Sequence, residues 1–231
     1  MNFKNKIPKE EYININYIDD KINDLLSNVN LNKEPKQELY ERALILNFLD
    51  KNSKVLEIGG GLGYVSNTIR NHLNNKNNHV VIEPHNKKAN DLKNKDFNVF
   101  NGIISNKELW FDNDYVTVYT ESENTKKISN ITNINKLQKQ FNIIFDTLVV
   151  DCEGALPKIM EDNPELYKQI KMIIIEYDWY FKECTEWRKL LINKYNFKSH
   201  FQLPLHWKPS KGKGALLDNN KLVGHEVLIK K

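Results

Sequence analysis

Three short segments of the chain place chemically active residue types where apolar strands end. Residues 57–64 read Glu-Ile-Gly-Gly-Gly-Leu-Gly-Tyr, residues 82–84 read Ile-Glu-Pro, and residues 151–155 read Asp-Cys-Glu-Gly-Ala. Closely spaced glycines let a ligand approach the main chain, and a helix that follows them offers free N–H donors. Carboxylates beside such a turn accept hydrogen bonds from hydroxyl groups or stabilise a cation. Together the three segments predict a site for a nucleoside ligand.

The spacing of the glycines distinguishes two kinds of nucleotide site. A dinucleotide site has the pattern Gly-x-Gly-x-x-Gly. Counted from Gly59 and Gly61, the third glycine would be residue 64. That position is Tyr64, and Gly63 comes one place early. The order acid-x-Gly-x-Gly-x-Gly, which begins at Glu57, instead resembles the first motif of class I S-adenosylmethionine-dependent methyltransferases. A carboxylate there suits a cationic sulfonium and ammonium better than a diphosphate. The alternative is a tight turn without a ligand, for which so many glycines would be costly.

An acid ends the second apolar run. Glu83 follows residues 79–82, lies twenty residues after the last loop glycine and precedes Pro84. At that distance an acid accepts hydrogen bonds from both hydroxyls of a ribose. We therefore predict that Glu83 and Pro84 belong to the cofactor site, together with the loop glycines and Tyr64. An NAD enzyme would show the same acid, and a surface glutamate is the other alternative. Asn101 and Gly102, after the third strand, are candidates for the adenine edge.

With these segments the chain resembles the FkbM family of methyltransferases. The resemblance rests on the glycine loop, on the Glu83-Pro84 pair and on the run from residue 151 to 155. Residues 131–137 and the apolar strand 173–176 are also similar, and the match covers roughly residues 35 to 180. The resemblance implies S-adenosylmethionine as cofactor, S-adenosylhomocysteine as product, and methylation of a hydroxyl on a small acceptor. Sugars, nucleotide sugars and glycoconjugates are the expected acceptors.

Asp151 and Glu153 are the candidate catalytic acids. A hydroxyl is a poor nucleophile at neutral pH, so a nearby base assists its deprotonation. We expect one of the two to contact cofactor or acceptor, Asp151 being also a candidate cofactor ligand, and the other to take the proton. A helix-capping role is the alternative for Glu153. Two carboxylates are poor evidence for a metal, so a divalent cation stays an open option and none is predicted. His206 is a third candidate base, with a solvated loop as the alternative.

Four residues are candidates for binding the acceptor: Glu176, Tyr177, Asp178 and Lys208. The first ends an apolar strand and the next two follow it. An aromatic ring there either stacks on a sugar face or belongs to the core. Lys208 precedes a segment of glycines and lysines, residues 209–214, which suggests a mobile lid that meets a phosphorylated sugar.

Alternating strands and helices position all these residues. The predicted strands are residues 55–58, 79–83, 98–104, 145–151, 172–176 and 226–229, and a hairpin is expected within residues 109–119. The predicted helices lie near residues 18–26, after Pro35, and at residues 64–73, 87–92 and 157–166. This order predicts a Rossmann-like, doubly wound α/β fold of the class I methyltransferase type. We expect a mostly parallel seven-stranded sheet with one antiparallel strand and helices on both faces. Residues 1–34 are predicted to form a helical or irregular extension, and residues 35–231 the methyltransferase domain.

Composition narrows the function classes. The chain has 231 residues, of which 40% are hydrophobic and 28% charged, and its net charge is +4. That charge is too small to argue for nucleic acid, so an RNA methyltransferase is a second alternative that would need a basic face with stacking aromatics. A catalytically inactive S-adenosylmethionine-binding partner subunit is a third.

Other sequence features bear on the setting of the protein. No apolar run approaches a membrane span, and we expect no signal peptide and no membrane partner. Cys152 and Cys184 have no metal-type spacing, so a reduced cytoplasmic setting is expected. The oligomeric state is not predicted.

Overall fold

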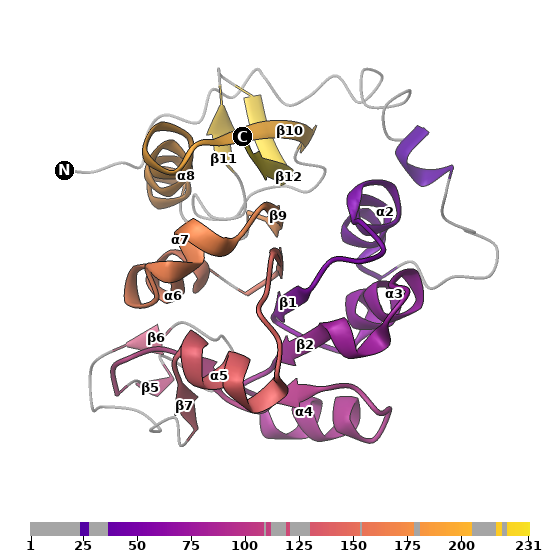
Figure 1. Cartoon of the computed structure of the whole chain (residues 1–231). Coiled ribbons are helices and arrows are strands. Elements are labelled where there is room, and N and C mark those ends of the chain that lie inside the picture. The colour runs from indigo at the N-terminus through magenta and orange to yellow at the C-terminus, as the bar shows by residue number, and fades with distance from the viewer. Residues whose placement is uncertain are drawn as a thin grey trace.

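A mostly parallel sheet forms the centre of the molecule (Figure 1). The computed structural model describes residues 24–27, 37–108, 110–111, 119–120, 130–152, 154–177, 181–204, 216–218 and 221–231. The strands of the sheet are β1 (Val55–Ile58), β2 (His79–Ile82), β3 (Val99–Phe100), β8 (Thr147–Val150), β9 (Met172–Glu176), β10 (Phe197–Pro204), β11 (Leu216–Asp218) and β12 (Lys221–Lys230). Their order is β10-β12-β9-β8-β1-β2-β3, and β11 pairs with β12. Strands β3, β2, β1, β8 and β9 pair in parallel, while β12 runs antiparallel to both β9 and β10. The continuous order of seven strands, with β12 as the antiparallel one, confirms the predicted fold class, and the short β11 adds an eighth strand beside β12.

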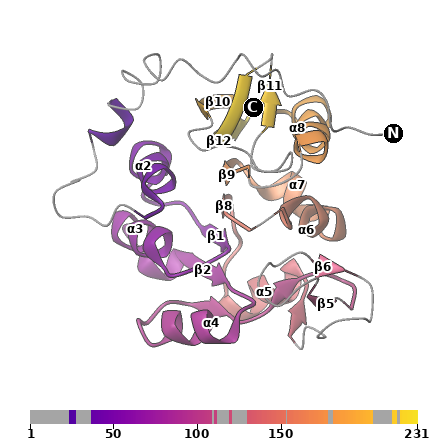
Figure 2. The same cartoon turned by 180° about the vertical axis from the view of Figure 1, so that it is seen from behind.

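Helices cover both faces of the sheet (Figures 1 and 2). On one face lie α2 (Leu39–Phe48), α3 (Tyr64–His72) and α4 (Asn86–Lys93), and on the other lie α5 (Ile134–Phe141), α6 (Leu156–Asp162), α7 (Glu165–Gln169) and α8 (Phe181–Tyr195). Successive strand residues point to opposite faces. Val55 and Val149 therefore pack with α2 and α3, while Leu56 and Leu148 pack in the cluster that contains α5 to α8.

The register of the sheet brings distant residues into one row. Val149 pairs with both Glu57 on β1 and Ile174 on β9, and all three side chains lie on the face covered by α2 and α3. Two residues further along the chain from this row, Gly59 and Asp151 directly follow β1 and β8, and Glu176 ends β9. His225 on the antiparallel β12 is the register partner of Glu176. The carboxyl edge of the sheet thus places residues from four strands next to one another.

Two predicted elements differ from the structure. The strand expected over residues 98–104 is divided at Asn101-Gly102, and its second half, β4 (Ile103–Ile104), pairs with β7 (Ile131–Thr132) in a separate small sheet. The backbone of Gly102 packs directly against the carbonyl oxygen of Asn130. A Cβ at this position would lie only 2.2 Å from that oxygen, so the close packing at the division requires glycine. The helix expected over residues 157–166 is likewise divided into α6 and α7, because Pro164 has no N–H with which to continue the α6 ladder.

Several short elements lie outside the main sheet. The predicted hairpin is present as the antiparallel pair β5 (Trp110–Phe111) and β6 (Tyr119–Thr120), and a short 3-10 helix spans Lys76–Asn78. Leu25, from the predicted extension, is buried against α2 and α3, and its carbonyl accepts a hydrogen bond from the side chain of Asn47. In the part of the chain that is described, no helix combines the length and apolar character needed to cross a membrane.

Candidate active site at the carboxyl ends of the strands

The glycine loop, residues 59–63, connects β1 to α3 in a conformation that few other residues adopt. Gly59, Gly61 and Gly63 have φ angles of 97°, 50° and 87°. A Cβ on Gly59 would lie 1.6 Å from the carbonyl oxygen of Asp151, so the backbones of the loop and of the residue after β8 are in direct contact. The loop therefore lies directly against the end of β8 and adopts its shape without a side chain at Gly59.

Glu83 forms a hydrogen bond with the main chain of this loop. Its side chain is 4% exposed, and its two carboxylate oxygens accept hydrogen bonds from the N–H of Gly61 at 2.9 Å and of His85 at 2.7 Å. Burial raises the pKa of Glu83, while the two backbone hydrogen bonds and the charges of Lys88 and His85 act in the opposite direction. A carboxylate has about four acceptor positions, so Glu83 retains the capacity to accept bonds from hydroxyl groups. Glu83 therefore contacts the glycine loop directly, and its binding of a ribose stays a prediction.

A second carboxylate, which was not predicted from the sequence, lies next to the loop and the first turn of α3. Glu38, at the start of α2, accepts a hydrogen bond from the N–H of Val65 in the first turn of α3 at 3.2 Å. A Cβ on Gly61 would lie 3.6 Å from the other carboxylate oxygen of Glu38. Burial raises the pKa of Glu38, and the hydrogen bond from Val65 lowers it. The glycine loop is therefore placed between two carboxylates, Glu83 and Glu38.

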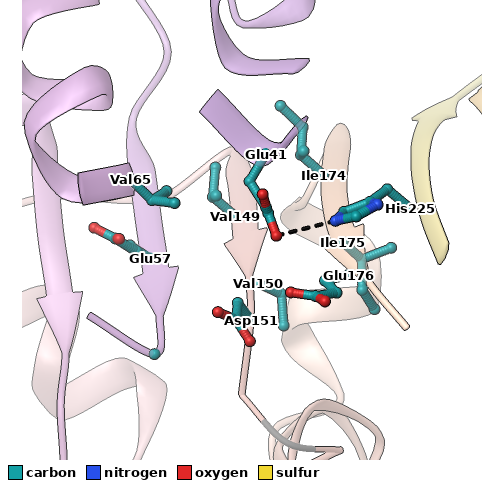
Figure 3. A pocket seen from close by; sticks show the side chains of 11 residues that line it. Glu41, Glu57, Val65, Val149, Val150, Asp151, Ile174, Ile175, Glu176 and His225 are labelled. Atoms are coloured by element: carbon teal, nitrogen blue, oxygen red, sulfur yellow. Dashed lines mark hydrogen bonds and ion pairs between the residues drawn. The ribbon is translucent and has the colours of Figure 1, made fainter. Parts of the chain in front are cut away.

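Glu57 is turned away from the ligand side. It is 1% exposed, and its two oxygens bond to the Ser66 hydroxyl at 2.9 Å and to His79 Nε2 at 2.8 Å. In Figure 3 its carboxylate points away from the other three carboxylates of the pocket. The predicted contact of Glu57 with a cationic cofactor stays a prediction, and in this structure the carboxylate links β1 to α3 and β2.

The remaining cofactor candidates surround the loop and Glu83. Asn101 donates its side-chain amide to the carbonyl oxygens of Glu83 and, at 3.4 Å, of Pro84, and thereby fixes the turn after β2. Gly102 packs against the Asn130 carbonyl, as described above. Tyr64 is the first residue of α3 and is half-buried. All four candidates thus lie on or beside the elements that form the loop.

A small pocket, with a cavity volume of about 10 Å³, adjoins the glycine loop (Figure 3). Gly59 and Asp151 line its side next to the loop, while Glu176, His225 and Glu41 line the side toward β12 and α2. His225 Nε2 lies 3.0 Å from Glu41 Oε1. The predicted catalytic residue Asp151 and the predicted acceptor ligand Glu176 are therefore brought together in one pocket with two residues that the sequence analysis missed.

Glu41 is strongly influenced by these neighbours. Burial alone raises the pKa of its carboxyl group, but a hydrogen bond from His225, the positive charge of that imidazole and a hydrogen bond with Glu176 outweigh burial and bring the pKa to about 2. Glu41 is therefore an anion over the whole physiological range.

Tyr177 lies in a different environment from Glu176. Its ring is 2% exposed, and its hydroxyl donates to Glu226 Oε2 at 2.5 Å. Glu226 also accepts hydrogen bonds from the guanidinium of Arg188 and from Gln202. These contacts are those of a core residue, one of the two options that the sequence left open. Glu153, Asp178, His206 and Lys208 lie outside the described residues.

The missed residues had weak signals in the sequence. His225 and Glu226 are two consecutive ionisable residues within the apolar strand β12, and both are buried. Such a pair in a central strand indicates buried polar partners, because burial of an unpaired charge is costly. Glu41 had no comparable signal, since acids are common on helix surfaces.

No protein-family model matches the chain, and no curated protein matches it. Among solved structures, it is similar to an O-methyltransferase from Bacillus cereus in complex with S-adenosylhomocysteine, with 14% identity over 91% of this chain and 89% of the other and a TM-score of 0.48. It is also similar to the O-methyltransferase TomG from Streptomyces achromogenes in complex with S-adenosylmethionine, with 11% identity over 91% and 88% of the two chains and a TM-score of 0.49. A ribosomal protein L11 methylase from Lactobacillus delbrueckii subsp. bulgaricus shares 10% identity over 85% and 80%, with a TM-score of 0.47. The strand order of the sheet, rather than these similarities, defines the fold.

Proposed function

We propose that the chain is a methyltransferase that binds S-adenosylmethionine on the glycine loop and transfers the methyl group to a hydroxyl of a small acceptor. A sugar or sugar conjugate is the proposed acceptor class, as the FkbM resemblance implies. The observation that carries the proposal is the position of the glycine loop between the carboxylates of Glu83 and Glu38.

The residues around the loop fit a nucleoside that carries positive charge. Glu83 faces the loop from the end of β2, where an acid in this type of fold accepts the ribose hydroxyls. A Cβ on Gly61 would meet no atom nearer than 3.6 Å, so a ligand can approach the backbone of the loop closely at this residue. Glu38 and the pocket acids place negative charge near the loop, and this charge stabilises an ammonium or sulfonium group.

The same geometry argues against a dinucleotide. In a dinucleotide site the pyrophosphate binds the free N–H groups at the N-terminus of the helix after the glycine loop. Here the Glu38 carboxylate already accepts the N–H of Val65 in that first turn. A pyrophosphate would have to displace this carboxylate or lie against it, which like-charge repulsion opposes.

The pocket beside Gly59 supplies the groups for transfer. When bound, S-adenosylmethionine supplies an electrophilic methyl group on a sulfonium that is already a good leaving group. Asp151 lies at the end of β8, between the loop and Glu176, and we assign it the role of accepting the proton of the acceptor hydroxyl. The rigid strands orient the acceptor relative to the loop, which is the main requirement when the leaving group is good.

Calorimetric titration with S-adenosylhomocysteine and with NAD tests the proposal. We expect S-adenosylhomocysteine to bind and to raise the melting temperature, whereas NAD does neither. Glu83→Gln should weaken S-adenosylhomocysteine about tenfold or more, because bonds to a charged acceptor contribute roughly 1.5–3 kcal/mol. Glu161→Gln, at an exposed glutamate on α6, is the matched control and should bind like the wild type. Binding of NAD but not of S-adenosylhomocysteine would overturn the proposal.

A further inference from the structure

We propose that Glu41, Glu176 and His225 form a binding site for one divalent metal ion of the Mn²⁺, Co²⁺ or Zn²⁺ type. One ligand atom from each residue, two carboxylate oxygens and one imidazole nitrogen, lies within 4.8 Å of the others. The closest pair, His225 Nε2 and Glu41 Oε1, is 3.0 Å apart. Neighbouring ligand atoms of one metal ion are separated by about 3 Å when each bond is about 2.1 Å, so a small shift of the side chains accommodates an ion.

Three separate elements hold the ligands in place. His225 and Glu176 face each other as register partners on β12 and β9, and Glu41 reaches them from α2 on the same face of the sheet (Figure 3). The side chains of His225 and Glu41 are only 1% and 12% exposed. Ligands carried by helices and strands are positioned more rigidly than ligands on loops. The site therefore forms from the fold itself and does not require a loop to close over it.

The charge around the pocket is a second, independent observation that indicates a cation. Four carboxylates line the pocket, those of Glu41, Glu57, Asp151 and Glu176, and among the described lining residues there is no lysine or arginine. Burial of several carboxylates is costly unless positive charge compensates them. His225 and His79 are the basic partners of Glu41 and Glu57, and a divalent ion bound by Glu41 and Glu176 adds further positive charge to this acidic pocket.

A second buried carboxylate–imidazole pair shows what distinguishes this cluster. Glu57 and His79 are 2.8 Å apart and almost fully buried, but the other oxygen of Glu57 accepts the Ser66 hydroxyl. No third carboxylate joins this pair among the described residues that offer metal ligands, whereas Glu176 joins Glu41 and His225. The pair of Glu57 and His79 is thus a structural counterpart of the proposed site without its third ligand.

The ligand set selects the kind of ion. Mg²⁺ and Ca²⁺ prefer oxygen ligands alone, whereas an imidazole nitrogen suits Mn²⁺, Co²⁺, Zn²⁺ and Fe²⁺. Three protein ligands leave further coordination positions, and the cluster shares its pocket with Gly59 and Asp151. If the proposed methyltransferase function holds, an oxygen of the acceptor can occupy one of these positions. That role rests on the proposed function, but binding of the ion does not.

Titration of the full chain with Mn²⁺, followed by electron paramagnetic resonance, tests the site. The protein is first treated with a chelator, and no cofactor is added. We expect about one Mn²⁺ to bind per chain, and Glu176→Gln and His225→Ala each to weaken binding about tenfold or more, since each removes one of three protein ligands. His79→Gln, in the matched pair, should leave Mn²⁺ affinity unchanged, which excludes a general effect of losing a buried histidine.

Two outcomes would overturn the proposal: an absence of Mn²⁺ binding in the wild type, or binding that persists unchanged in Glu176→Gln. Glu176 is half-buried, so this variant tests the site even if His225→Ala does not fold. Calorimetry with S-adenosylhomocysteine on the same preparation separates the two proposals. Mn²⁺ binding without S-adenosylhomocysteine binding contradicts only the methyltransferase, and the reverse result contradicts only the metal site.

Discussion

The two halves of the carboxyl edge of the sheet are built in different ways. The half formed by β1 and β2 consists of the glycine loop and Glu83, which lie within one short stretch of the chain. The half formed by β8, β9 and β12 takes its side chains from four elements, and its Glu41 and His225 are 184 residues apart. The first half depends on backbone shape, and the second depends on buried charge. A local motif therefore describes the first half, whereas only the topology produces the second.

The largest expected effect concerns the backbone contact that joins the two halves. Gly59→Ala should destabilise the protein by about 3 kcal/mol or more, because its Cβ would lie 1.6 Å from the Asp151 carbonyl oxygen at a positive φ. Gly61→Ala is the matched control, since its Cβ has no atom nearer than 3.6 Å, and should cost only about 1 kcal/mol. Denaturant unfolding measures both. Equal costs for the two variants would show that the loop is not pressed against β8.

The next effect separates binding from chemistry. Asp151→Asn should lower turnover about a hundredfold, as expected for loss of a general base, and change S-adenosylhomocysteine affinity by less than about threefold. Turnover is measured with an acceptor found by screening nucleotide sugars, and affinity by calorimetry. Unchanged turnover would remove Asp151 from the mechanism, and a large loss of affinity would assign it to cofactor binding instead.

Glu41 should make the half of the edge formed by β8, β9 and β12 sensitive to acid. Its pKa of about 2 in the folded chain lies below the ordinary value of 4.5, so its ionised form adds stability that is fully present above about pH 4.5 and is lost as the pH falls toward 2. The stability advantage of the wild type over Glu41→Gln should therefore shrink, on the order of 2 kcal/mol in total, as the pH is lowered. His225, Glu176 and Tyr40 face this carboxylate, so both proteins in the comparison keep these three residues. Unfolding measured with chelator present checks this, and an advantage that grows in acid would contradict it.

Glu83 should show the opposite and smallest trend. Burial raises its pKa above 4.5 in the folded chain, so the native state holds its proton more tightly than the unfolded state. Wild-type stability should then fall as the pH rises from about 4.5 through the raised pKa, and Glu83→Gln lacks this loss. The stability difference should move in favour of the variant between about pH 4.5 and 7 in the ligand-free protein. A shift in favour of the wild type would mean that the hydrogen bonds from Gly61 and His85 dominate.

The contrast between the halves also explains what the sequence revealed. The alternation of strands and helices predicted the sheet, and the glycine spacing pointed to the loop that Glu83 contacts, because these signals are local. The cofactor role of these residues stays a prediction. Helix α8 and strand β10 were not predicted, since α8 mixes charged and apolar residues without a clear apolar face. The partnership of Glu41 with His225 depends on how α2 packs over β9 and β12. No spacing along the chain encodes that contact, so only the folded structure reveals it.

A crystal structure of the chain with S-adenosylhomocysteine tests the central claim most directly. The account predicts that the ribose hydroxyls bond to Glu83 and that the amino-acid end lies on the glycine loop. It also predicts that the sulfur points toward the pocket lined by Asp151 and Glu176. A ligand bound elsewhere, or one whose ribose makes no contact with Glu83, would contradict the assignment of the two halves.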